Sequence, residues 1–285
     1  MCVLVGIGIN FTTTISITHA SSIKYPDWHD EEWIYRRKIQ VSQNPTLINQ
    51  TVDDFPLLVT IKDDLHLANY TQSDGSDIFF TSIDSATKLH HEIEHYDSTA
   101  GDLVAHVLIP SISPGKEIYM YYGNSQAPNR QNPDMLWSNY YIGVWHMNET
   151  TGSVIDSSPN NNHGTAHGGL VREYDSLIGN GYFYNGSNSY VSTIPISWQS
   201  LDQYTMCVRF KPYSFPAYPY RQVVVGTFPH EYSVLLEDNQ INLFHGQFVW
   251  TGGNLNTYSW NQFCHSVDRS SRNLKTYLNG NLVRN

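Results

Sequence analysis

The sequence contains one stretch that matches a known metal-binding pattern, His91-Glu92-Ile93-Glu94-His95. In zinc proteases this H-E-x-x-H pattern lies on a helix, because residues four apart then share a face and two imidazoles reach one zinc ion while the glutamate activates water. Residues 87–96 instead alternate between polar and apolar side chains, which indicates a strand. On a strand His91 and His95 share a face but lie about 13 Å apart, too far for one metal ion. We therefore predict a coincidence on a strand, with no metal and no enzyme activity.

The same stretch places two carboxylates, Glu92 and Glu94, on one face of the expected strand, with Tyr96 as the third residue. Laminarinase-type jelly rolls use three carboxylates at i, i+2 and i+4 of a strand as nucleophile, helper and acid. Since Tyr96 replaces the third carboxylate, we predict a solvated acidic strand face and no glycosidase site. The sequence contains no nucleophile elbow, phosphate loop or dinucleotide-binding pattern.

A polar turn at residues 156–162 is made of Asp, Ser, Pro and Asn and offers oxygen atoms of the kind that Ca²⁺ prefers. Asp156 is its single carboxylate, so calcium binding there would be weak. The alternative is an Asx-type turn, in which these side chains bind their own backbone. No other cofactor is expected.

Aromatic residues alternate with prolines in the segment 212–220. Rigid aromatic side chains suit stacking on sugar rings or anchoring a protein partner. The sequence leaves open both this interpretation and its alternative, a loop that covers the end of a sheet. The candidate ligand-binding residues are Tyr213, Phe215, Tyr218 and Tyr220.

The composition indicates which elements carry these residues. The chain has 285 residues, enough for two domains of about 150 residues each. Only 15% of the residues are charged while 13% are aromatic, including 20 tyrosines, which favours short strands and polar loops over long helices. The net charge of −10 disfavours nucleic acid and anionic lipid as partners, since both attract positive charge.

The N-terminal residues 1–22 carry no charged side chain and begin with an apolar run. This pattern predicts a signal peptide, an extracellular or cell-surface location and no membrane insertion of the mature chain. Two cysteines remain after cleavage, Cys207 and Cys264. In an oxidising compartment they can form a disulfide, and two small buried thiols are the alternative.

Period-two alternation recurs along the first half of the chain and indicates short strands. Six of them indicate an antiparallel sandwich over residues 28–123. Residues 124–139 are rich in Pro and Asn and are predicted to be a linker, and residues 140–285 repeat the strand-and-turn pattern. The predicted fold class is therefore all-β, with two tandem antiparallel β-sandwiches. The strands of the first are expected at 33–41, 55–61, 78–82, 89–96, 103–109 and 117–122.

Both halves contain stretches that are similar to known families. Residues 28–123 contain, in this order, WHDEEWIYRRKIQV, FPLLVTI, SDGSDIFFT, LHHEIEHYD and IYMYYGN. Together these resemble a domain of unknown function that lies upstream of lectin-like jelly rolls in prokaryotic surface proteins. Residues 140–285 contain VWHMNE, VIDSSPNNNHGT, IGNGYFYNGSNSYV, YTMCVRFKP and WNQFCHSVDRSSRNLKTYLNGNLV. These resemble a concanavalin A-like jelly roll of the laminin-G type, which continues past YLNG, so we expect the 285 residues to stop short of the complete jelly roll.

The resemblance implies an exported recognition protein that binds carbohydrate or adheres to an extracellular protein, and no enzyme. Two alternatives remain. One is a structural spacer in an envelope or appendage protein, and the other is the non-catalytic part of a larger secreted hydrolase. A binding module is expected to lose retention on a glycan when Tyr218 and Tyr220 are replaced, whereas a spacer is not retained at all.

Overall fold

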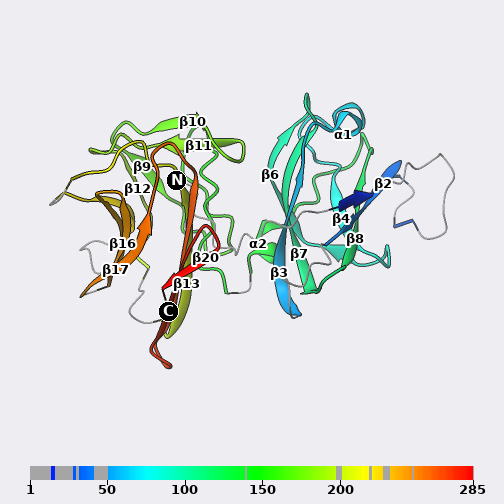
Figure 1. Cartoon of the computed structure of the whole chain (residues 1–285). Coiled ribbons are helices and arrows are strands. Elements are labelled where there is room, and N and C mark those ends of the chain that lie inside the picture. Colours follow the sequence, from blue (N-terminus) through cyan, green and yellow to red (C-terminus); the bar gives the residue numbers. More distant parts are fainter. Residues whose placement is uncertain are drawn as a thin grey trace. The chain divides into compact units, whose positions relative to one another are not determined.

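The structure is a computed structural model, and it describes residues 14–16, 28–29, 32–41, 51–138, 140–196, 201–217, 220–226, 232–245 and 247–284. The chain divides between Tyr141 and Ile142 into two units. We call them the N-terminal unit (Gly8–Tyr141) and the C-terminal unit (Ile142–Asn285). In both units the described residues form mostly antiparallel strands, with only two short helices (Figure 1). The all-β prediction is confirmed.

The described strands of the N-terminal unit form two antiparallel sheets. Its described strands are β1 (Thr14–Ser16), β2 (Tyr35–Gln40), β3 (Val52–Ile61), β4 (Phe79–Ser82), β5 (Lys88–Leu89), β6 (His91–Asp97), β7 (Asp102–Ile112) and β8 (Glu117–Tyr122). The first sheet has the order β1-β2-β8-β4-β5, and the second has the order β3-β7-β6. Each strand that the sequence predicts for this unit overlaps a strand of the structure.

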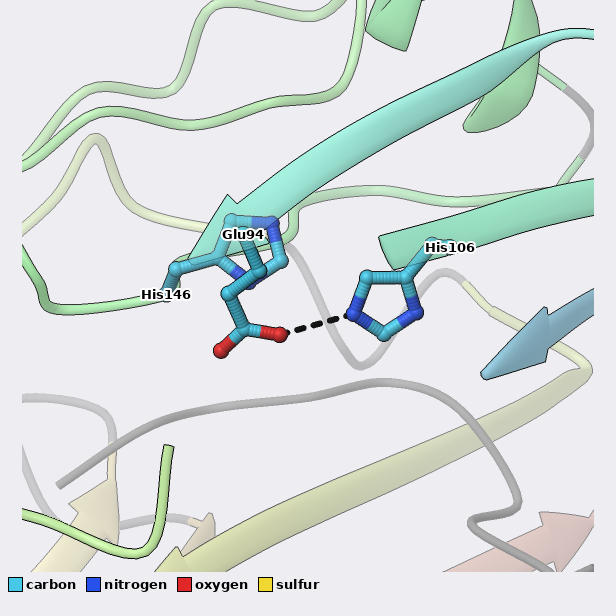
Figure 2. A group of neighbouring side chains, drawn as sticks. All are labelled: Glu94, His106 and His146. Carbon is cyan, nitrogen blue, oxygen red and sulfur yellow. Dashed lines mark hydrogen bonds and ion pairs between the residues drawn. The ribbon is translucent and has the colours of Figure 1, made fainter. Parts of the chain in front are cut away.

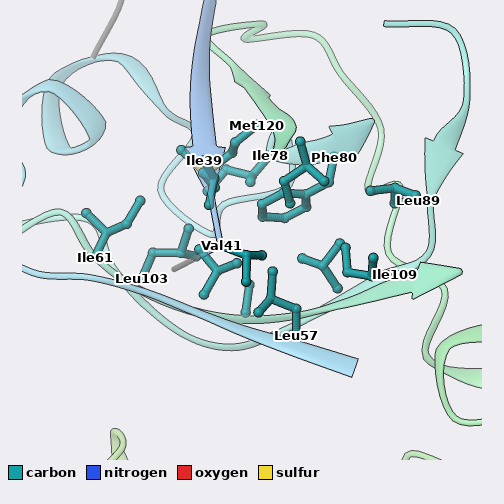
Figure 3. Close-up of a cluster of buried hydrophobic side chains, with 14 of the residues drawn as sticks. Ile39, Val41, Leu57, Ile61, Ile78, Phe80, Leu89, Leu103, Ile109 and Met120 are labelled. Carbon is teal, nitrogen blue, oxygen red and sulfur yellow. The ribbon is translucent and has the colours of Figure 1, made fainter. Parts of the chain in front are cut away.

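Side chains from both sheets of the N-terminal unit meet in one hydrophobic core (Figure 3). Ile39 and Met120 come from the first sheet, and Leu57 and Ile109 come from the second. All four are fully buried, at 0% exposure. Alternate residues of β3 and of β7 point into the core, which is the arrangement that period-two alternation predicts. Trp33 precedes β2 and belongs instead to a second, aromatic cluster.

Helix α1 (Leu65–Tyr70) follows β3 and is fixed by its first turn. Asp64 caps the helix by accepting hydrogen bonds from the amides of His66 (3.0 Å) and Leu67 (2.9 Å). The same carboxylate lies 2.7 Å from Nη1 of Arg37, a fully buried residue of β2. Burial by itself raises the pKa of Asp64, but Arg37 and the two amides outweigh it and lower the pKa below its usual value. This ion pair connects α1 to the first sheet, and Leu67 of the helix adds to the contact by packing into the core.

The segment predicted to be a linker, residues 124–139, is part of the N-terminal unit. Helix α2 (Pro133–Leu136) lies within it, and Trp137 directly after the helix is fully buried. Nε2 of Gln72 donates a hydrogen bond of 2.9 Å to the carbonyl oxygen of Asn124. The Pro and Asn residues of this segment are therefore common here because they make turns and a helix cap, although the composition is typical of a linker. The N-terminal unit extends to Tyr141.

Antiparallel strands also build the C-terminal unit. Its described strands are β9 (Thr165–His167), β10 (Val171–Asp175), β11 (Asn180–Phe183), β12 (Tyr190–Ser192), β13 (Gln203–Phe210), β14 (Gln222–Gly226), β15 (Tyr232–Glu237), β16 (Gln240–His245), β17 (Gln247–Asn254), β18 (Asn261–Asp268), β19 (Asn273–Leu278) and β20 (Asn281–Arg284). They form two four-stranded sheets, β13-β18-β19-β20 and β14-β15-β16-β17, and two pairs, β10-β11 and β12-β9.

The two four-stranded sheets share one hydrophobic core. Val208 and Phe263 come from the β13-β18-β19-β20 sheet, and Val234 and Leu243 come from the β14-β15-β16-β17 sheet. All four side chains are at most 3% exposed. Two sheets that bury one face each against a common core agree with the predicted β-sandwich.

Cys207 and Cys264, whose pairing the sequence left open, form a disulfide. The two residues lie directly opposite each other on β13 and β18, with their Cα atoms 4.1 Å apart. The bond links residues 57 positions apart in the sequence and therefore closes a long loop of the chain.

Most of the predicted signal peptide, residues 1–13 and 17–22, lies outside the described residues. Among the residues that are described, no helix is both long enough and apolar enough to cross a membrane. The signal peptide and the export of the chain stay predictions.

Candidate functional site

The H-E-x-x-H stretch lies on strand β6, and a β-bulge interrupts it. The register between β6 and β7 shifts between Ile93 and His95, so Glu94 is an extra residue that reverses the alternation of faces. His91 faces the core, where its ring centroid lies 5.3 Å from that of Phe80. His95 comes after the bulge and faces the opposite side of the sheet. The predicted strand is present, but the prediction that both histidines share a face is wrong, because the bulge turns them apart.

The bulge also changes the predicted acidic face. Tyr96 packs against the core and donates a hydrogen bond of 3.1 Å to the carbonyl oxygen of Leu67, so it does not follow Glu92 and Glu94 on their face. Glu94 is only 7% exposed, and Oε2 of Glu92 accepts a 2.6 Å hydrogen bond from Nε1 of Trp137. The prediction of a solvated acidic face is wrong, because residues 124–139 pack over this side of the strand.

Glu94 is joined to a histidine on the neighbouring strand. Its Oε2 lies 2.8 Å from Nε2 of His106 on β7, and both side chains are buried (Figure 2). The His106 ring lies 5.2 Å from Trp137. The sequence did not predict this pair, because alternation along one strand does not show which residue of the neighbouring strand lies opposite Glu94. A carboxylate that orients an imidazole occurs in catalytic and metal sites and also in structural pairs. Within the N-terminal unit the pair ties β6 to β7 at the bulge.

Acid is expected to destabilise the N-terminal unit through His91. Burial lowers the pKa of this histidine from 6.5 to about 4, although hydrogen bonds to the carbonyls of Leu89 and Ile78 oppose the change. Below about pH 6.5 the imidazole of His91 therefore takes up a proton in the unfolded chain, whereas in the folded chain it stays neutral until the pH approaches 4. The stabilisation is complete above pH 6.5 and is lost as the pH falls towards 4, by at most about 3 kcal/mol. Urea unfolding between pH 7 and pH 4.5 measures this loss.

The His91→Gln variant removes the titrating group and is expected to unfold with a much flatter dependence on pH. His95→Gln is the matched control, since His95 lies on the same strand and is only half-buried. If His91→Gln and the unchanged chain lose the same free energy of unfolding between pH 7 and pH 4.5, burial of neutral His91 is not the cause.

Asp156 lies at the centre of the polar turn considered as a calcium site. Its Oδ1 accepts hydrogen bonds from the amides of Val144 (2.8 Å) and Ser158 (2.9 Å). Its Oδ2 accepts from the Ser158 hydroxyl and the Asn162 amide, both at 2.9 Å. This is the geometry of an Asx-type turn. Weak calcium binding at Asp156 stays a prediction, and it would require the ion to displace these four donors.

Aromatic side chains from three segments of the C-terminal unit gather around Tyr213. Its ring centroid lies 5.3 Å from that of Tyr258 and 5.6 Å from that of Phe183, both nearly edge-on. Nζ of Lys211 lies over the Tyr213 ring at 5.6 Å and over the Trp260 ring at 5.2 Å, within the range of cation–π attraction. We call these five residues the Tyr213 cluster. It combines flat apolar ring faces with hydroxyl groups and one positive charge.

Tyr258 is the exposed member of the Tyr213 cluster, with 71% of its surface in solvent. Its φ of 60° lies in the left-handed region, which bulky residues rarely adopt. The Tyr258 amide donates a 2.7 Å hydrogen bond to the carbonyl oxygen of Pro212, and this bond holds its ring beside Tyr213. Strained backbone that presents an exposed side chain is typical of functional sites. Sequence reasoning missed Tyr258, and its only signal is an aromatic residue two positions before Trp260 in the loop between β17 and β18.

The predicted ligand-binding residues do not stay together. Tyr213 joins the cluster, whereas Phe215 packs against the core of the C-terminal unit. Tyr220 is 73% exposed, and Tyr218 lies outside the described residues. The carbonyl oxygen of Pro216 accepts a 2.9 Å hydrogen bond from the Asp238 amide, which fixes the loop to the β15–β16 turn. One part of the loop therefore covers the sandwich and another part presents aromatic rings.

The polar Asp156 turn and the β6–β7 bulge both fall in a region that has known relatives. Residues 74–163 match the family described as Domain of unknown function (DUF2341). This match confirms the predicted domain of unknown function, at a position further along the chain than the predicted residues 28–123. No curated protein and no solved structure matches the chain. The DUF2341 match ends at His163, so the concanavalin A-like assignment of the C-terminal unit stays a prediction.

Proposed function

We propose that this chain is an exported, non-enzymatic surface protein that binds carbohydrate through its C-terminal unit, a concanavalin A-like jelly roll. The Tyr213 cluster is the observation that carries the proposal. It presents the ring of Tyr258 to solvent beside the ring of Tyr213, with the charge of Lys211 next to them.

The chemistry of the cluster suits a sugar. A pyranose ring has apolar C–H faces and hydroxyl groups around its edge, so it can stack on an aromatic face while its hydroxyls bind polar groups. Here the ring faces come from Tyr258 and Trp260, and the donors come from the Lys211 ammonium group and the tyrosine hydroxyls.

The cluster is held in place before any ligand arrives. The Tyr258 amide donates a hydrogen bond to the carbonyl oxygen of Pro212. The Asp238 amide donates one to the carbonyl oxygen of Pro216 in the same loop. Two prolines and two backbone hydrogen bonds restrict the loop. Binding therefore costs little conformational entropy, which is the advantage of a preorganised site. Such a site favours recognition over a purely structural spacer, which has no need of a strained and exposed tyrosine.

Replacement of Tyr258 by alanine is expected to weaken carbohydrate binding about tenfold, because a well-placed aromatic side chain contributes more than about 1 kcal/mol to a binding site. The measurement is retention of the full chain on an array of neutral and acidic glycans, followed by titration of the best ligand. Tyr213→Ala is expected to have the same effect, since it removes the ring that supports Tyr258.

Tyr190→Ala is the matched control. Tyr190 is a tyrosine of the same unit, 54% exposed, and its ring stacks on His167 of the paired strand β9. This variant is expected to bind as the unchanged chain does. Absence of retention on every glycan would contradict the proposal and favour the spacer. Equal binding by Tyr258→Ala and the unchanged chain would move the site away from the Tyr213 cluster.

A further inference from the structure

The C-terminal unit contains a second group of polar atoms whose hydrogen-bonding needs are not met. Asn242 of β16 is fully buried, at 0% exposure, and within the described structure neither its Oδ1 nor its Nδ2 has a hydrogen-bond partner. Oε1 of Glu237 on β15 is also buried and without a partner there. Buried polar groups are almost always satisfied, so three unmet atoms on neighbouring strands indicate that an occupant completes them.

The strand register places these side chains on one face of the β14-β15-β16-β17 sheet. Val234 and Leu236 of β15 point into the core, so Leu235 and Glu237 point to the opposite, outer face. Asn242 is paired with Leu235 and therefore shares this outer face with it. Glu237 and Asn242 are diagonal neighbours in the ladder, which puts their Cα atoms about 7–8 Å apart. A single small group can reach both side chains.

Irregularities of the sheet flank this place on both sides. The register between β14 and β15 shifts at Val224, next to the pair formed by Val223 and Leu235. The register between β16 and β17 shifts directly before Asn242, which pairs with Trp250. Bulges occur next to binding sites, where they redirect side chains and bend the strand. Two bulges lie next to the same row of paired residues, which runs through Val223, Leu235 and Asn242. This indicates that the row has a specific role.

The unmet atoms define the chemistry of the occupant. Nδ2 of Asn242 needs an acceptor, whereas Oδ1 of Asn242 and Oε1 of Glu237 need donors. A metal ion would satisfy the two oxygens but not Nδ2. Glu237 is already neutralised by Arg221, whose Nε lies 3.0 Å from Oε2, so no further charge is needed. A hydroxyl group is neutral and both donates and accepts.

We propose that the outer face of the β14-β15-β16-β17 sheet is a second saccharide site, in which sugar hydroxyls bind Asn242 and Glu237. It goes beyond the Tyr213 cluster and does not use it. The row of residues that contains Asn242 reaches solvent at Val223, which is 47% exposed. Asn242 and Glu237 are at most 1% exposed, so a sugar reaches them only after the structure around them opens, and it associates slowly.

The test uses the full chain with D-glucose, D-galactose, D-mannose and N-acetyl-D-glucosamine as probes. Saturation-transfer NMR is expected to detect at least one of them on the unchanged protein. The same sugar in large excess is expected to raise the unfolding temperature of the C-terminal unit by about 2–4 °C. Absence of both signals for all four sugars overturns the inference and leaves enclosed water as the occupant.

Two variants locate the site. Asn242→Leu keeps the size of the side chain, removes two unmet polar atoms and is expected to unfold at the same or a higher temperature while losing the sugar-induced shift. Glu237→Gln is expected to weaken the sugar at least fivefold. Asn273→Leu, at an exposed position of β19 in the other four-stranded sheet, is the matched control and is expected to keep the shift. A shift that survives in both Asn242→Leu and Glu237→Gln overturns the inference.

The Tyr213 cluster is tested separately. Tyr258→Ala is expected to weaken glycan binding at that cluster about tenfold and to leave the monosaccharide shift unchanged. If Tyr258→Ala weakens the binding of every sugar and Asn242→Leu weakens none, the second site is overturned while the proposed function stands. The reverse result overturns the cluster as the site and supports the outer face of the sheet.

Discussion

Replacing Arg37 with alanine is expected to destabilise the N-terminal unit by about 3–5 kcal/mol, as loss of one partner of a buried ion pair usually does. Arg37 is 1% exposed, and Asp64, its partner at 2.7 Å, has a side chain that is 13% exposed. Without Arg37 the carboxylate of Asp64 stays partly buried with no cation beside it. Urea unfolding of the full chain, followed through the transition of the N-terminal unit, measures the change.

A double variant separates the charge from the packing. Asn at position 64 still caps α1 but carries no charge, and Met at position 37 fills most of the volume of the arginine. Arg37→Met combined with Asp64→Asn is therefore expected to recover most of the stability that Arg37→Ala removes. If the double variant is as unstable as Arg37→Ala, the uncompensated charge is not the reason for the loss.

Removal of the disulfide between Cys207 and Cys264 is expected to destabilise the C-terminal unit by about 2–4 kcal/mol. A cross-link restricts the unfolded chain more when the loop is longer, and here the two cysteines are 57 positions apart. The measurement is the urea midpoint of the oxidised chain, of the reduced chain and of the Cys207→Ala/Cys264→Ala variant.

The N-terminal unit is the internal control for this experiment, since no cysteine lies between Cys2 and Cys207 in the sequence. Its urea midpoint is expected to be the same with and without reductant. An unchanged midpoint of the C-terminal unit after reduction would contradict the prediction.

The strands of the N-terminal unit were predictable because each has one buried face. Ile39 and Val41 alternate with polar residues, and both point into the core. Helix α1 was not predictable from periodicity, because six residues make less than two turns. Its stability comes from a cap and from Arg37, which is distant in the sequence. The linker prediction for residues 124–139 failed for a related reason, since composition does not distinguish exposed polar residues from those that cap and turn a packed segment.

The residues whose side chains could bind or react were recognised from the sequence, but their positions relative to one another were predicted wrongly. Alternation puts Glu92, Glu94 and Tyr96 on one face, and a single extra residue at the bulge sends Tyr96 to the core. Asn242 gave no signal at all, because a buried asparagine and an exposed one look alike in a strand pattern. Tyr213 was recognised, but Tyr258 became its neighbour only through folding.

The sequence by itself determined the class of the protein: all-β, with short strands set by period-two burial and a domain of unknown function that a family match confirms. These properties depend on local alternation and composition, which a strand carries in any context. The tertiary structure decided the pairing of Cys207 with Cys264, the partner of Glu94, the burial of Asn242 and the assembly of the Tyr213 cluster. Each of these depends on strand register and on contacts between distant segments, which local alternation does not encode and which one extra residue in a strand is enough to change.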